Sequence, residues 1–288
     1  MENFLKIAIG LTLFGLKLSE GLNTTTKELT YLKTKPSLLR RSLLAVDVLV
    51  PLVAFAIVII FQLPRGIAVA ILLVAASPGS PLSSRKVFNK GGIFAYGASL
   101  HLIVLLLSVI TTPITLKLFF AFDDFKIDVS LLGIVNQIMI AQLIPLGIGI
   151  FIHQKFPSLG EKIVKPITII ANLALIGIIF LILVITFKFV LQIDFSSLLA
   201  IVLVVASSLG IGHLFGGRNH ERRHTLALVC ASRNIGLAVF IASSNFPINA
   251  ILPNLIPYLF FGAIVEAIYL KILNSGARSA GERVKGKG

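Results

Sequence analysis

Long apolar segments constrain this chain more than any other feature. A helix that crosses the ~30 Å hydrocarbon core of a bilayer needs about 20 mostly apolar residues. Such segments occupy residues 4–20, 42–62, 66–87, 92–118, 130–153, 165–187, 196–216, 225–245 and 250–273. We therefore predict an all-α membrane protein in which residues 1–274 form one domain of nine transmembrane helices. A basic, disordered cytoplasmic tail is expected over 275–288.

The composition supports this interpretation and argues against other classes. Of the 288 residues, 56% are hydrophobic and 13% are charged, whereas about 25% of residues in a soluble domain are charged. One cysteine leaves no disulfide framework and no cysteine-based metal site. The sequence contains no metal-ligand cluster, phosphate loop or nucleic-acid recognition module, so we expect neither an enzyme nor a nucleic-acid partner.

The first segment resembles a secretory signal peptide, because Lys6 precedes an apolar run. Lys17-Leu18-Ser19-Glu20 follows that run in place of a small-residue cleavage site. A retained helix is therefore expected.

Lysine and arginine are distributed unevenly between alternate loops. One set of loops and the tail contain Lys27, Lys33, Lys35, Arg40, Arg41, Lys90, Lys155, Lys162, Lys165, Arg218, Arg222, Arg223, Arg278, Arg283, Lys285 and Lys287. The opposite loops contain Arg65, Lys117, Lys126 and Lys188. Cytoplasmic loops carry the excess of positive charge. The N-terminus is thus expected outside and the C-terminus in the cytoplasm, in the inner (cytoplasmic) membrane.

Two of the segments are poor continuous helices. The third contains Ser77-Pro78-Gly79-Ser80-Pro81-Leu82-Ser83-Ser84, and a helix interior is destabilised by ~3 kcal/mol for each proline and ~1 for glycine. The eighth carries Arg233-Asn234 midway along an apolar run, where an arginine costs about 2.5–3.5 kcal/mol on insertion scales. Both 66–87 and 225–245 are therefore predicted to be broken helices that line a protein cavity.

The two broken segments occupy corresponding places in two halves of opposite orientation. The halves cover about 1–121 and 130–273 and are predicted to be inverted repeats, the first lacking one helix. Interrupted helices at matching positions indicate a transporter site near the bilayer midplane.

At these segments the chain resembles the bile acid:sodium symporter family, as a divergent bacterial member of nine-helix form. The resemblance runs through Gly10–Leu16, Pro78-Gly79, Lys90-Gly91, Gly210–Gly216 and Arg233–Ala238. It implies two broken helices that cross inside a core domain, which moves against a panel domain.

The departures from the family pattern concern its sodium site. Ser84 stands where the family has Asn, Val229 where it has a sodium-binding Glu, and Arg233 where it has Gln; Asn234 is kept. Two like unit charges ~4 Å apart repel by ~4 kcal/mol at an effective dielectric near 20. A repulsion of this size would lower the affinity for sodium about a thousandfold. Our hypothesis is that Arg233 replaces the sodium ion, so that sodium binding is weak or absent. Ser83, Ser84 and Asn234 are the remaining candidate ligands.

The expected site residues fall into two groups. Candidates for substrate binding are Ser77, Pro78, Gly79, Ser80, Ser83, Ser84, Ser232, Arg233, Asn234 and His101; candidates for charge pairing or coupling are Asp47, Arg233, Glu266 and Arg85. Several alternatives stay open. Arg233 either binds an anion or forms an ion pair with Asp47 or Glu266, and Asp47 either pairs or carries a coupling proton. His101 either titrates or bonds a hydroxyl, Glu266 either pairs with a basic residue or faces the cavity, and Arg85 either faces the site or reaches the membrane surface.

These features predict a secondary transporter of a small organic anion that works by alternating access in a lipid bilayer. The alternatives are a sodium-coupled symporter with a rearranged ion site and a membrane sensor or scaffold that binds a ligand without moving it.

Overall fold

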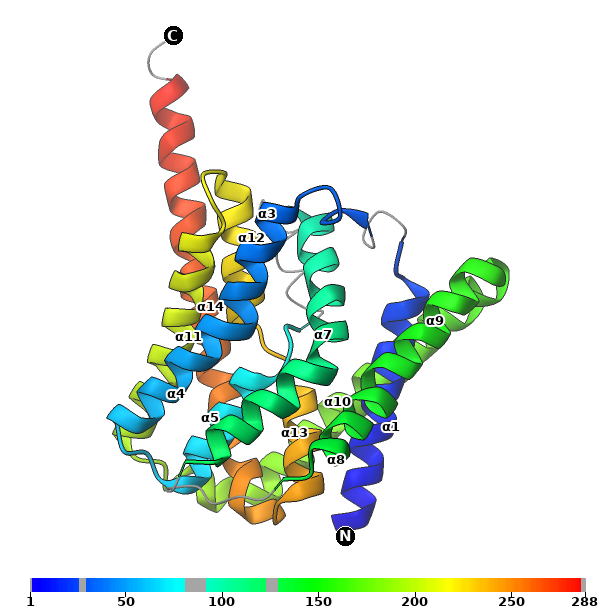
Figure 1. The fold of residues 1–288 in the computed structure, drawn as a ribbon, viewed down its shortest axis with the longest axis vertical. Coiled ribbons are helices and arrows are strands. Elements are labelled where there is room, and N and C mark those ends of the chain that lie inside the picture. Colours follow the sequence, from blue (N-terminus) through cyan, green and yellow to red (C-terminus); the bar gives the residue numbers. More distant parts are fainter. Residues whose placement is uncertain (1, 26–29, 81–91, 123–128, 286–288) are drawn as a thin grey trace.

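The structure is a computed structural model that describes residues 2–25, 30–80, 92–122 and 129–285, and this part of the chain is a bundle of helices (Figure 1). The helices are α1 (Glu2–Leu22), α3 (Pro36–Leu43), η1 (Leu44–Leu49), α4 (Val50–Ile60), α5 (Arg65–Ala76), α7 (Phe94–Phe120), α8 (Leu131–Ile138), η2 (Met139–Leu143), α9 (Ile144–Lys155), α10 (Pro157–Val190), α11 (Phe195–Phe215), α12 (His220–Ala231), α13 (Ile235–Asn245) and α14 (Ile248–Lys285).

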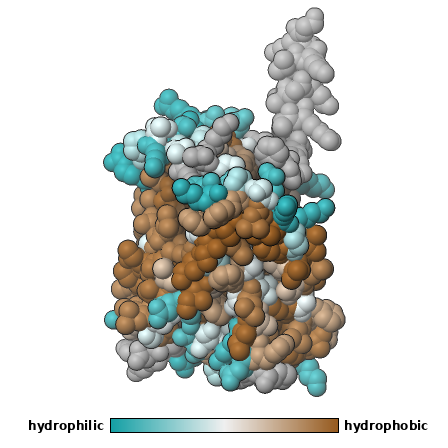
Figure 2. All heavy atoms as spheres, turned by 90° about the vertical axis from the view of Figure 1, so that its right-hand side faces the viewer, coloured by the Kyte–Doolittle hydropathy of each residue, from teal (hydrophilic) through white to brown (hydrophobic). Residues whose placement is uncertain are grey.

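In the part of the chain that the structure describes, six helices are long and apolar enough to cross a membrane. They span Pro36–Ile60, Phe94–Phe120, Leu131–Lys155, Pro157–Lys188, Phe195–Phe215 and Ala250–Ile272, and α5 and α13 are shorter apolar helices. A broad apolar band covers the middle of the face in Figure 2, between polar residues at its upper and lower edges. A multi-pass membrane protein is thereby confirmed, whereas the count of nine spans and the inverted repeat remain predictions.

Helix α14 continues to Lys285 and so includes most of the segment expected to be a disordered tail. The residues beyond 275 include alanine, arginine, glutamate and lysine, which favour helix, and disorder of this segment stays a prediction.

Two spans widen into a π-helical turn directly before a proline. Pro51 follows η1 and Pro145 follows η2. A proline removes a donor and clashes with the carbonyl four residues earlier, and a local π turn accommodates such an irregularity. These turns contain Asp47 and Gln142, two polar residues of the central region.

Glycines allow helix backbones to approach closely. Membrane proteins use such close contacts because lipid provides no hydrophobic driving force between helices. Helix α1 packs against α9 and α10, and a Cβ on Gly21 would lie 2.2 Å from the Leu146 carbonyl oxygen. A Cβ on Gly212 of α11 would lie 2.5 Å from the Ala227 Cα of α12. In the other part of the bundle, every residue of α5 from Ile67 to Ala76 is buried. Helix α5 thus holds the first break at the centre of the protein.

Candidate functional site

The two broken segments cross each other through their backbones. Helix α5 ends at Ala76, followed by Ser77 in an extended conformation, and α12 is separated from α13 by residues 232–234. Gly79 and Arg233 form an antiparallel bridge. The Ser80 N–H donates to the Ser232 carbonyl at 2.7 Å, and the Asn234 N–H donates to the Pro78 carbonyl at 2.8 Å. The described part of the first break is thus paired with the second break through main-chain hydrogen bonds, as expected if the two segments cross.

Arg233 ties this crossing to a third segment. Its side chain is 5% exposed. The Nη1 atom donates to the Ser77 carbonyl at 3.1 Å, and Nη2 donates to the Val46 carbonyl of η1 at 2.6 Å. The guanidinium therefore joins the end of α5, η1 and the second break through main-chain oxygens.

The ion pairs offered as alternatives for Arg233 are not formed by the described residues. Asp47 is half-buried beside Val46. Neither its Oδ2 nor Nε of Arg233 has a hydrogen-bond partner among the residues described. Glu266 instead accepts a hydrogen bond from the Ser232 hydroxyl at 2.8 Å. The guanidinium of Arg233 thus makes its hydrogen bonds to main-chain carbonyls, while the Asp47 carboxylate lies near enough to attract it electrostatically.

Asn234 caps the half-helix that follows the second break. Its Oδ1 accepts from the Leu237 N–H at 3.1 Å, and its Nδ2 donates to Gln142 Oε1 of η2 at 3.0 Å. The other amide atom of Gln142, Nε2, is buried and has no hydrogen-bond partner in the described part of the chain. Asn234 therefore links the crossing to the helix group around α1, because η2 packs against α1.

Two cavities share part of their lining at the crossing. The first, of about 180 Å³, is lined in part by Thr12, Ser80, Ser232, Arg233, Tyr258 and Glu266. The second, of about 220 Å³, is lined in part by Lys17, Asn23, Ser80, His101, Asn172 and Asn234. Both include Leu13, Ser80, Leu175 and Gly236. A Cβ on Gly236 would lie 2.7 Å from Leu13 Cδ2, so this contact narrows the space between the cavities.

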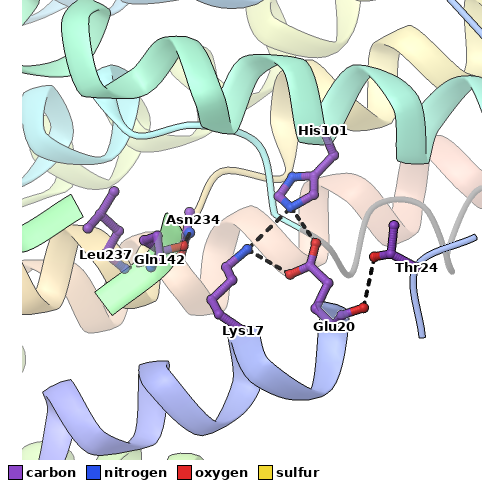
Figure 3. A network of polar contacts seen from close by, with 7 residues as sticks. All are labelled: Lys17, Glu20, Thr24, His101, Gln142, Asn234 and Leu237. Atoms are coloured by element: carbon purple, nitrogen blue, oxygen red, sulfur yellow. Dashed lines mark hydrogen bonds and ion pairs between the residues drawn. The ribbon is translucent and has the colours of Figure 1, made fainter. Parts of the chain in front are cut away.

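A polar cluster on the second cavity was missed by the sequence analysis, except for His101. Lys17 Nζ lies 2.7 Å from Glu20 Oε2 and 3.2 Å from His101 Nε2, and His101 Nε2 lies 2.8 Å from Glu20 Oε1 (Figure 3). Lys17 and His101 are almost fully buried. The available signal was the i, i+3 spacing of Lys17 and Glu20 within an apolar segment.

The structure brings most of the predicted site residues together. Ser77, Pro78, Gly79, Ser80, Ser232, Arg233 and Asn234 lie at the crossing, whereas His101 lies with Lys17 on the second cavity. Ser77 donates its hydroxyl to the Leu73 carbonyl of its own helix. Ser83, Ser84 and Arg85 lie outside the described residues. Among the described residues, no group of three histidine, cysteine, aspartate or glutamate residues could hold a metal ion.

Interrupted helices that cross inside an apolar bundle, with cavities beside the crossing, are characteristic of secondary transporters, and this is the class that the fold defines. The model of the sodium bile acid symporter family matches residues 10–193, more than half of the chain. The chain belongs to this family.

Three relatives extend the comparison. An uncharacterized sodium-dependent transporter, YocS of Bacillus subtilis, is 26% identical over 259 residues, which cover 87% of this chain and 77% of that protein. Human sodium/bile acid cotransporter 4 is 32% identical over 41% of this chain and 27% of its own length. The probable chloroplastic sodium/metabolite cotransporter BASS2 of rice, Oryza sativa subsp. japonica, is 24% identical over 52% of this chain and 35% of its own length.

Proposed function

We propose that the protein is a secondary active transporter of a small organic anion, in which Arg233 occupies the role of a bound sodium ion. We place it in the cytoplasmic membrane with its N-terminus outside, following the charge asymmetry of the loops. The observation that carries the proposal is the pair of hydrogen bonds from the Arg233 guanidinium to the Ser77 and Val46 carbonyls.

A sodium ion prefers oxygen ligands, as other hard cations do. Arg233 supplies a permanent positive charge to two carbonyl oxygens on different elements, which is what a coordinated cation would do. Val229, where the family has a carboxylate, is fully buried beside Gly79. A sodium ion in this region would be repelled by the guanidinium. Because position 229 carries no carboxylate, nothing there would offset this repulsion, and sodium binding is disfavoured.

Alternating access requires one part of the bundle to move against another. Helices α1, α9 and α10 pack on one another, while α5, α11 and α12 belong to the part that contains the crossing. Leu13 of α1 rests on Gly236 of α13 between the two cavities. Relative movement of the two parts would separate this contact and open one cavity toward the other, in the manner of core and panel domains.

A sodium-coupled symporter is the second candidate. Three relatives are named as sodium-dependent transporters or sodium cotransporters. Asn234 is paired with Gln142, whose Nε2 has no partner among the residues that the structure describes. A ligand sensor that does not transport is the third. The site geometry favours the first candidate, because a fixed cation already fills the crossing.

Counterflow in proteoliposomes distinguishes the three candidate functions. Vesicles loaded with unlabelled organic anions are diluted into the same labelled anion, in sodium or in choline. The proposal expects exchange of at least one anion at equal rates in both salts. Exchange that needs sodium would support the symporter, and ligand-induced thermal stabilisation without any exchange would support the sensor.

A further inference from the structure

The wall of the second cavity holds a buried charge cluster that the crossing does not use. Lys17 and Glu20 come from α1 and His101 comes from α7, so the cluster joins two helices that are distant in the sequence. Lys17 is 3% exposed and His101 is 2% exposed. Charges buried to this degree in a membrane protein are functional candidates, because they are costly to insert.

The distances decide which atom of His101 carries a proton. A carboxylate is only an acceptor, so the 2.8 Å contact with Glu20 Oε1 requires a proton on Nε2. Lys17 Nζ, at 3.2 Å from the same nitrogen, then cannot donate to it and is oriented by Glu20. In the neutral imidazole the remaining lone pair lies on Nδ1. This atom is buried and has no hydrogen-bond partner among the described residues.

With a neutral imidazole, the cluster balances one positive charge on Lys17 with one negative charge on Glu20. An additional anion in the cavity would leave one negative charge uncompensated in a poorly solvated place, which is unfavourable. A proton on Nδ1 restores the balance, because it converts His101 into a cation.

Resting on the transport function proposed above, we infer that the second cavity binds the carboxylate of a small polar acid at Lys17 together with one proton on His101. The proton comes from solution and adds to the lone pair of Nδ1. The anion and the proton then enter and leave the site as an electrically neutral pair. Arg233 stabilises the crossing, and Lys17 provides the charge that meets the substrate.

The cavity selects the size and polarity of this acid. Its volume of about 220 Å³ lies below the ~300–1,000 Å³ of typical drug-sized ligand sites. The side chains of Asn23, Thr24, Thr168, Asn172 and Asn234 add amides and hydroxyls to its lining. These groups suit an acid that carries hydroxyls, such as a short hydroxycarboxylate.

The groups that act on His101 belong to α1. Lys17 and Glu20 are within hydrogen-bond distance of its Nε2. Elements α3, η1, α5, α8, η2 and α12 pack against α7, but none of their charged residues in the described part of the chain forms an ion pair or hydrogen bond with His101.

Calorimetry of lactate binding to the purified full-length protein tests the inference. Titrations in two buffers with different ionisation enthalpies give the number of protons taken up. Wild type is expected to bind lactate with about one proton per molecule and not to bind lactamide, its neutral isostere. His101→Gln is expected to bind lactate about tenfold more weakly with no proton uptake, and Lys17→Gln is expected not to bind it. Lys33→Gln, which removes an exposed lysine, is expected to match wild type.

Thermal unfolding of Lys17→Gln and His101→Gln, compared with wild type, shows whether each variant is folded before its binding is measured. Lactate binding without proton uptake, or proton uptake that persists in His101→Gln, would overturn the inference. So would a wild-type protein that exchanges another anion in proteoliposomes and does not bind lactate, although the transport proposal would stand. Lactate binding with proton uptake but no exchange of any anion would refute transport and leave the binding site.

Discussion

Arg233 and Lys17 are both buried cations in the central region, yet they are held in different ways. Arg233 donates to two main-chain carbonyls and lies in a helix break. Lys17 lies on the continuous helix α1 and is held by the side chain of Glu20, which also accepts a hydrogen bond from His101. The guanidinium is planar and always charged, whereas an ammonium is a compact charge that exchanges partners easily. The difference suggests that Arg233 maintains the fold and that Lys17 handles a ligand.

The largest expected effect separates these two roles by stability. Arg233→Gln removes two charge-assisted hydrogen bonds, each worth about 1.5–3 kcal/mol, and should lower the unfolding free energy by ~3 kcal/mol or more. Lys17→Gln combined with Glu20→Gln removes both charges of the buried pair and leaves neither uncompensated, so it should cost only ~1–2 kcal/mol. Unfolding in detergent, followed by circular dichroism, measures both. Equal losses would remove the distinction between the two cations.

A second test restores the family residues at the crossing. Val229→Glu combined with Arg233→Gln replaces the fixed cation by a carboxylate and an amide, so the double variant should need a sodium ion. Sodium at ~100 times its dissociation constant should stabilise this variant by ~2.7 kcal/mol and leave wild type unchanged. Thermal unfolding in sodium chloride, with choline chloride as the control, gives the answer. If sodium does not stabilise the double variant, sodium and the Arg233 guanidinium do not occupy the same position.

Two asparagines allow the crossing to be compared with the surface. Asn234 caps α13 at the crossing, and Asn219 caps α12 at an exposed end. Asn219→Ala should cost ~1 kcal/mol, as is usual for a lost cap. Asn234→Ala should cost ~2–3 kcal/mol, because Gln142 Oε1 is also left unpaired. Denaturation of both variants under one condition tests this, and equal costs would show that the crossing tolerates unpaired polar groups.

The smallest effect is expected outside the membrane, at the cap of α11. Hydrogen bonds from Ser196 and Ser197 lower the pKa of Asp194 to about 2. The stabilisation is therefore present above the ordinary pKa of an aspartate and is lost as the pH falls toward 2. Asp194→Ala should cost ~1 kcal/mol at neutral pH and less below pH 4. A cost that is the same at pH 7 and pH 3 would contradict this.

The sequence predicted the features that depend on local chemistry. Prolines and glycine located the first break, the Arg233-Asn234 pair located the second, and the family resemblance supplied their crossing. The partners of Arg233 were not predictable, because main-chain carbonyls carry no sequence signal. The Lys17–His101 contact joins residues 84 positions apart, and an apolar helix such as α7 gives no indication of which face meets α1.

Equilibrium binding of ²²Na⁺ to the purified protein tests the central claim, that Arg233 stands in the place of sodium. The account predicts no saturable binding to wild type and saturable binding to the protein carrying both Val229→Glu and Arg233→Gln. Saturable binding to wild type that disappears in Asn234→Ala would contradict it.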